Sequence, residues 1–219
     1  MVNDQSLINE FCKLFSRQDG EGIRTFFSPG RINLIGEHTD YNGGNVFPCA
    51  ITFGTYGIVR KRNDRLVRLY SMNFPEAGII EFRIDELNYV KEHTWANYPK
   101  GMIHYIQEAG YSLDTGIEVL IYGNIPNGAG LSSSASLEML VGVIVNELFS
   151  LEIDRIALVK LGKKVENEFI GVNSGIMDQF AVGMGKKDSG ILLDCNTLNY
   201  EYAPINLTHH EIIIMNTNK

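Results

Sequence analysis

A strand, a glycine–serine loop and an apolar helix follow one another directly in the middle of this chain. Residues 116–125 (GIEVLIYGNI) have the composition of a buried strand, and Pro126 ends it. Residues 136–149 (SLEMLVGVIVNELF) are apolar on nearly every side. A helix of that kind is stable only when other elements surround it, so this segment predicts a buried central helix.

The rest of the chain mixes helical and β-like segments. Helical spacing of apolar residues recurs at residues 4–18, 97–109 and 154–169. Residues 25–81 form short β-like runs, and Asn63-Asp64 predicts a hairpin turn between TYGIVRKR and RLVRLYSM. Further strands are expected at 190–195 (GILLDC) and 211–215 (EIIIM). Because the elements do not alternate regularly as βαβ units, we predict an α+β fold, with helices packed on a mixed sheet.

Composition excludes several classes of protein. The chain has 19 Lys+Arg against 26 Asp+Glu, a net charge of −7, which argues against a nucleic-acid partner. We interpret the basic cluster from Arg60 to Arg68 as a solvated rim. The longest apolar stretch, Met139 to Val145, is far too short for a membrane span. Three widely spaced cysteines and an N-terminus without a basic region favour a cytoplasmic protein without a secretory signal.

The glycine–serine loop, Pro126 to Ser136, has the features of an anion site. Glycines allow backbone N–H groups to converge, and the start of the following helix adds unpaired N–H groups and a positive dipole end. Serine hydroxyls can donate to phosphate oxygens or bind Mg²⁺. The loop lacks the lysine of a Walker A motif and the third glycine of a Rossmann fingerprint. A simple glycine-capped loop with serine N-caps is the alternative interpretation.

A second polar cluster occupies residues 28–44 (SPGRINLIGEHTDYNGG). It places Arg31, Glu37, His38, Asp40 and Tyr41 among glycines. Carboxylates and amides beside an aromatic ring suit a polyhydroxylated ligand, whose hydroxyls need both donors and acceptors. A solvated turn with a surface salt bridge is the alternative.

Three segments together resemble a known family. The segment GRINLIGEHTDYNGGNVFPCAI resembles the galactokinase signature, and PNGAGLSSSAS resembles the phosphate loop of the GHMP kinases, to which galactokinases belong. GVNSGIMDQF is similar to a third shared segment. The resemblance covers the whole chain. It implies a GHMP kinase N-terminal domain at residues 1–200 and the start of a truncated C-terminal region at 201–219.

Galactokinases transfer the γ-phosphate of MgATP to the C1 hydroxyl of galactose, so the resemblance implies ATP, galactose and Mg²⁺ as ligands. Glu37, His38 and Asp40 match residues that bind the sugar hydroxyls. Asp178 matches the catalytic aspartate that accepts the hydroxyl proton, and Arg31 matches the arginine that stabilises the transferring phosphoryl group. Since a guanidinium near Asp178 would favour its carboxylate form, we expect Asp178 mainly to orient the hydroxyl and to accept its proton late.

The remaining site residues follow from the same resemblance. Ser134 and Glu166 match the Mg²⁺ ligands, and Ser71 falls where the family contacts the nucleotide. The residues expected to cradle the ATP phosphates are Gly128, Ala129, Gly130, Leu131, Ser132, Ser133 and Ser134.

Alternatives to a galactokinase remain open at the level of sequence. A kinase acting on N-acetylgalactosamine would share these motifs, since pocket shape decides the acceptor. A non-catalytic sensor of galactose and ATP is a rival from another class, although the intact GLSSSAS favours an enzyme. The family extends well beyond NTNK, so we expect residues 1–219 alone to have little or no kinase turnover. The sequence leaves the oligomeric state open.

Overall fold

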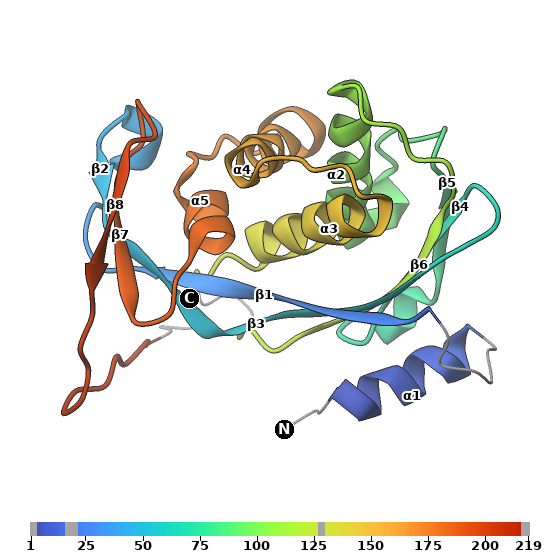
Figure 1. The fold of residues 1–219 in the computed structure, drawn as a ribbon, viewed down its shortest axis with the longest axis horizontal. Coiled ribbons are helices and arrows are strands. Elements are labelled where there is room, and N and C mark those ends of the chain that lie inside the picture. The colour runs from blue at the N-terminus through green and yellow to red at the C-terminus, as the bar shows by residue number, and fades with distance from the viewer. Residues whose placement is uncertain (1–3, 16–21, 127–129, 216–219) are drawn as a thin grey trace.

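A five-stranded sheet forms the centre of the structure, a computed structural model that describes residues 4–15, 22–126 and 130–215 (Figure 1). Its strands lie in the order β1-β3-β6-β4-β5. Only β4 and β6 pair in parallel, so the sheet is mixed. The strands are β1 (Arg24–Asn33), β3 (Pro48–Lys61), β4 (Leu66–Ser71), β5 (Ile80–Arg83) and β6 (Ile117–Gly123).

Helices cover one face of this sheet, and α3 lies at the centre of them (Figure 1). The helices on this face are α2 (Asn97–Glu108), α3 (Ser133–Phe149), α4 (Arg155–Lys164) and α5 (Met177–Met184). The apolar residues of α3 from Met139 to Val141, with Ile144 and Val145, are at most 1% exposed. This burial confirms the predicted central helix. Burial of each such side chain contributes about 1.5–3 kcal/mol to the stability of the fold.

The opposite face of the sheet is covered by α1 (Asp4–Leu14) (Figure 1). Leu7 and Phe11 of this helix pack with Ile58 of β3 and Leu120 of β6. The helix predicted at residues 4–18 is therefore present from residue 4 to 14, and residues 16–18 lie outside the described part.

A three-stranded antiparallel sheet lies at one end of the molecule (Figure 1). It contains β2 (Asn45–Val46), β7 (Ser189–Asp194) and β8 (Tyr200–Pro204). The expected division after residue 200 falls at the first residue of β8. The α+β class with a mixed sheet is confirmed. Among the described residues, no helix is long and apolar enough to cross a membrane.

Short helical turns complete the chain between these elements. Three are 3₁₀ turns, at Asp40–Asn42, Pro75–Ala77 and Lys91–Ala96. The fourth, Val165–Ile170, is a π-helical turn that continues directly from α4.

The predicted hairpin at Asn63-Asp64 is wrong, although the chain does turn there. β6 lies between β3 and β4 and pairs with both. The connection is held by the start of β6 instead, where the Gly116 N–H donates to the Asp64 carbonyl at 2.6 Å. A Cβ at Gly116 would lie 1.9 Å from the Leu66 carbonyl oxygen, so only glycine allows this close approach.

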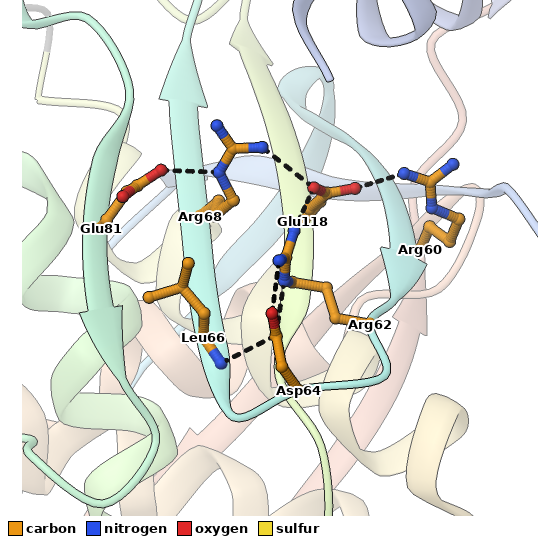
Figure 2. A network of polar contacts seen from close by, with 7 residues as sticks. All are labelled: Arg60, Arg62, Asp64, Leu66, Arg68, Glu81 and Glu118. Atoms are coloured by element: carbon orange, nitrogen blue, oxygen red, sulfur yellow. Dashed lines mark hydrogen bonds and ion pairs between the residues drawn. The ribbon is translucent and has the colours of Figure 1, made fainter. Parts of the chain in front are cut away.

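The basic cluster is only in part the solvated rim that the sequence predicted, since Lys61 and Arg65 are exposed but the other three arginines surround a buried carboxylate. Arg60, Arg62 and Arg68 converge on the carboxylate of Glu118, which lies on β6 and is only 3% exposed (Figure 2). Arg60 itself is buried, with its guanidinium 5.6 Å from the centre of the Phe11 ring. The cluster therefore connects three strands and α1, because a buried carboxylate requires cationic partners.

The strand predicted at EIIIM is absent. Residues 211–215 have no regular structure, and Ile213 and Met215 are 78% and 86% exposed. A strand requires a neighbour, and no strand among the described residues pairs with this segment.

Candidate active site

Arg31 and Asp178 form an ion pair at the centre of the candidate site, although 147 positions separate them in the chain. Arg31 lies near the end of β1, and Asp178 lies in the first turn of α5. The guanidinium contacts Oδ1 of Asp178 through Nε at 2.8 Å and through Nη2 at 2.7 Å. Its Nη1 donates to the Gly130 carbonyl at 2.6 Å. Arg31 thus connects the glycine–serine loop to α5.

The backbone of this loop also touches β1 directly. The Arg31 N–H donates to the Leu131 carbonyl at 3.2 Å. A Cβ at Gly30 would lie 2.8 Å from the same oxygen, so a side chain there would push the loop away. Leu131 is buried with Ile32, Cys49 and Ile125. It can therefore offer a phosphate only its backbone.

The hydroxyl of Ser132, a residue predicted to cradle the ATP phosphates, points to Asp178. This N-cap residue of α3 has φ = 61°, a left-handed conformation that is strained for a residue other than glycine. Its hydroxyl donates to Oδ2 of Asp178 at 2.5 Å. Both carboxylate oxygens of Asp178 are consequently hydrogen-bonded, one to Arg31 and one to Ser132, and its orientation is fixed.

Ser134 and Glu166, the predicted Mg²⁺ ligands, are in contact. The Ser134 hydroxyl donates to Oε1 of Glu166 at 2.6 Å. Glu166 lies in the π-helical turn and is only 7% exposed. A hydroxyl and a carboxylate are donors of the type that Mg²⁺ accepts. In the part of the chain that the structure describes, no three His, Cys, Asp or Glu side chains gather as a metal site. A metal ion here would therefore complete its shell with water or ligand oxygens.

The other residues of the predicted phosphate cradle lie at the start of α3 or shortly before it in the sequence. Ser133 is exposed at the start of α3. Gly130 has φ = 65°, a conformation that favours glycine. Gly128 and Ala129 lie outside the described residues.

The predicted sugar-binding loop, residues 36–44, is organised by its own side chains. Glu37 is exposed, and its Oε1 accepts a hydrogen bond from Asn33 at 2.8 Å. His38 has φ = 63°, and its Nδ1 lies 2.6 Å from the Tyr41 hydroxyl. The loop thus presents an exposed carboxylate and an exposed imidazole, each held by a neighbouring side chain.

Asp40 connects this loop to the segment before α5. Its Oδ1 accepts the Tyr41 N–H at 2.8 Å. A Cβ at Gly175 would lie 1.9 Å from its Oδ2, so the carboxylate approaches the backbone of Gly175 closely. Gly175 precedes Asp178 by three residues, which brings the loop close to the Arg31–Asp178 pair.

A pocket of about 240 Å³ opens at the start of α3, and three of the residues that line it, Ser71, Ser133 and Ser134, were predicted from the sequence. Ser71 is only 2% exposed. Trp95, the only tryptophan of the chain, also lines the pocket, and its buried Nε1 has no hydrogen-bond partner. Burial, and then the charge of Glu166, raise the pKa of Tyr98 in the same wall. The pocket therefore has an aromatic wall and reaches Ser134, one of the two predicted metal ligands.

Two protein families, each named by its description, match parts of the chain. "Galactokinase galactose-binding signature" matches residues 9–61, which contain β1, the sugar-binding loop and β3. "GHMP kinases N terminal domain" matches residues 97–186, which contain α2 to α5 and the glycine–serine loop.

Individual relatives are similar over nearly the whole chain. A galactokinase of Ligilactobacillus salivarius is 62% identical over 217 residues, which cover 99% of this chain and 55% of that protein. A galactokinase of Streptococcus mutans is 61% identical over 218 residues, with 100% and 55% covered. The chain thus spans about half the length of the curated relatives that it matches.

Solved structures agree with these relatives. The Lactococcus lactis galactokinase complexed with galactose superposes with a TM-score of 0.89 and 51% identity, covering 97% of this chain and 57% of that one. The Methanococcus jannaschii mevalonate kinase superposes with a TM-score of 0.68 at 19% identity, covering 85% of this chain and 56% of that one, which shows a shared fold only. The chain belongs to the GHMP kinase family and corresponds to the N-terminal portion of its galactokinases.

Proposed function

We propose that the protein containing this sequence transfers the γ-phosphate of ATP to the C1 hydroxyl of galactose. The observation that carries the proposal is the Arg31–Asp178–Ser132 contact, which lies beside the Ser134–Glu166 pair. A carboxylate with a fixed orientation, a guanidinium, and a hydroxyl–carboxylate pair that could bind a metal ion therefore lie together. Phosphoryl transfer needs such positioning and charge stabilisation more than it needs covalent help.

The acceptor half of the site is formed by the sugar-binding loop. Glu37, His38 and Asp40 offer acceptors and a ring nitrogen to the hydroxyls of a sugar. The Lactococcus lactis relative was crystallised with galactose, which supports this choice of acceptor.

Asp178 is the group that orients the reacting hydroxyl in this proposal. Its Oδ1 is occupied by Arg31, so Oδ2 is the oxygen available to the C1 hydroxyl once the Ser132 hydroxyl shares or leaves it. As the C1 oxygen bonds to the γ-phosphorus and ADP departs, the hydroxyl proton passes to Oδ2. Arg31 stabilises the negative charge that accumulates on the transferring group.

The nucleotide half includes the pocket beside Ser134. Its aromatic wall suits a flat base. The N–H groups at the start of α3, with Ser133 and the loop backbone, would hold the phosphates. Ser134 and Glu166 would hold Mg²⁺, which when bound neutralises phosphate charge. A cytoplasmic location is part of the proposal, and the three free cysteines support it.

Galactose-dependent release of ADP tests the proposal, measured on the protein at its natural length with MgATP. We expect turnover with galactose and a loss of kcat in Asp178→Asn, which keeps the shape of the carboxylate but not its charge. Nucleotide binding, measured by calorimetry, should survive in that variant. Residues 1–219 alone should turn over little or not at all.

Two results would contradict the proposal. Absence of galactose-dependent ADP release by the natural-length protein would exclude galactose as the acceptor. Near-normal turnover by Asp178→Asn would remove Asp178 from the mechanism. The same assay with N-acetylgalactosamine as the acceptor distinguishes two causes of failure. Turnover with that sugar would mean that the acceptor was wrongly assigned, and no turnover with either sugar would mean that the proposed phosphoryl transfer is wrong.

A further inference from the structure

A fully buried acid lies directly behind the candidate site. Glu138 on α3 and Gln179 on α5 are both 0% exposed. Nε2 of Gln179 donates to Oε2 of Glu138 at 2.9 Å, which connects the two helices. The proposed reaction uses neither side chain.

Each of these residues is close in sequence to a residue of the site. Glu138 follows Ser134 by four positions, one turn along α3. Gln179 is the immediate neighbour of Asp178. Because the backbone of a helix is stiff over one turn, fixing Glu138 and Gln179 fixes the positions of Ser134 and Asp178 as well.

The third helix at this junction, α4, takes part through a glycine. Gly162 precedes Glu166 by four positions. A Cβ at Gly162 would lie 3.0 Å from Cγ of Gln179 and 3.4 Å from Oε2 of Glu138. The lack of a side chain therefore lets α4 approach the Glu138–Gln179 pair closely, one turn before the Glu166 carboxylate.

The pair is not explained by stability. Oε1 of Glu138 and Oε1 of Gln179 are buried and have no hydrogen-bond partner. Two well-packed apolar side chains would avoid the free-energy cost of burying these polar atoms. Burial, and then the charge of Glu166, raise the pKa of Glu138 well above its ordinary value. A neutral carboxyl there can donate its proton, as an amide would.

We propose that Glu138 and Gln179 are positioning residues that, with Gly162, hold Asp178 and the Ser134–Glu166 pair in register across α3, α4 and α5. The inference rests on the proposed function, since it assigns these residues to the same phosphoryl transfer. A hydrogen-bonded pair specifies one separation and one rotation of the helices, whereas apolar contacts permit several. Displacement of a reacting group by about 1 Å is enough to lower kcat by about 100-fold.

Kinetics of Glu138→Ala and Glu138→Gln in the natural-length protein test this role. We expect Glu138→Ala to lower kcat about 100-fold while the KM values for ATP and galactose change by less than about threefold. Glu138→Gln should keep most of the activity, because its amide can accept from Gln179 and can donate to Oε1 of Gln179. Glu147→Ala, on the same helix but half-exposed, is the matched control and should leave kcat unchanged.

Three results would overturn the proposal. The first is a normal kcat in Glu138→Ala with only a lower melting temperature, which would make the pair purely structural. The second is an equal loss of kcat in Glu138→Gln, which would mean that the charge of the carboxylate matters and the hydrogen bond does not. If Glu138→Ala does not fold, Gln179→Met serves in its place, and a normal kcat there is the third.

A structural measurement separates this proposal from the proposed function. If the wild type phosphorylates no sugar, the function fails on its own evidence. Crystal structures of the wild type and Gln179→Met then decide about the positioning residues. We expect the contact between Arg31 and Asp178 to be present in the wild type and displaced in Gln179→Met. An unchanged contact would overturn the role of Gln179.

Discussion

Replacement of Glu118 by alanine should destabilise the protein by about 3–5 kcal/mol. Glu118 is 3% exposed, and its carboxylate contacts the guanidinium groups of Arg60, Arg62 and Arg68 (Figure 2). Removal of the carboxylate leaves a buried cation without its partner, and that unpaired charge is the source of the destabilisation.

The three arginines do not contribute equally to this figure. Arg62 and Arg68 keep second partners, Asp64 and Glu81, and their side chains are 21% and 24% exposed. Water can therefore replace part of what they lose. The side chain of Arg60 is only 9% exposed, and among the described residues its one carboxylate contact is with Glu118. The expected loss is consequently that of one buried pair and not three.

Urea unfolding followed by circular dichroism measures the free energy of unfolding. Asp85→Ala is the matched control, because Asp85 also connects two arginines, Arg65 and Arg83, but at the surface. Its loss should be much smaller, since solvent screens exposed pairs. A loss below about 1 kcal/mol in Glu118→Ala, or equal losses in the two variants, would refute the reasoning from burial.

Two other changes test separate parts of the structure. Replacement of Gly175 by alanine should weaken galactose binding at least about tenfold, because the new Cβ would lie 1.9 Å from Oδ2 of Asp40. Unchanged affinity in a calorimetric titration would contradict the role of Asp40. Stability should also fall as the pH drops below about 6.5. Burial, and then the charge of Lys100, lower the pKa of His93, so the unfolded chain takes up the proton more readily. The melting temperature should depend less on pH in His93→Gln, and an equal dependence would exclude His93 as the cause.

The sequence predicted α1 to α4 because their signals are local, but it did not predict α5, the short helix that carries Asp178. The helix expected from Asp154 begins there because Oδ1 of Asp154 accepts the N–H groups of Ile156 and Ala157. Strand pairing is not a local signal. The insertion of β6 between β3 and β4 depends on contacts between residues more than 50 positions apart, such as Gly116 with Asp64. No periodicity within a single strand records which strand will lie beside it.

In the candidate site, too, some features could be predicted from the sequence and others could not. Its motifs indicated which residues would gather, and Arg31 and Asp178 do lie together. The direction of the Ser132 hydroxyl could not be predicted, because it follows from a left-handed backbone conformation that serine rarely adopts. Trp95 was missed because it lies in an irregular 3₁₀ segment outside every motif. Its signal was only that it is the single tryptophan of the chain.

The acidity of the site has different consequences for the two proposed substrates. A sugar is neutral, and its hydroxyls can donate to the carboxylates of the sugar-binding loop, so acids favour the acceptor there. ATP is an anion, and it would approach Glu166 and Asp178 while Arg31 is already paired with Asp178. The nucleotide half therefore needs positive charge from elsewhere, and the start of α3 supplies only partial charges. The Ser134–Glu166 pair lies at that position, where a bound cation would lower the repulsion most.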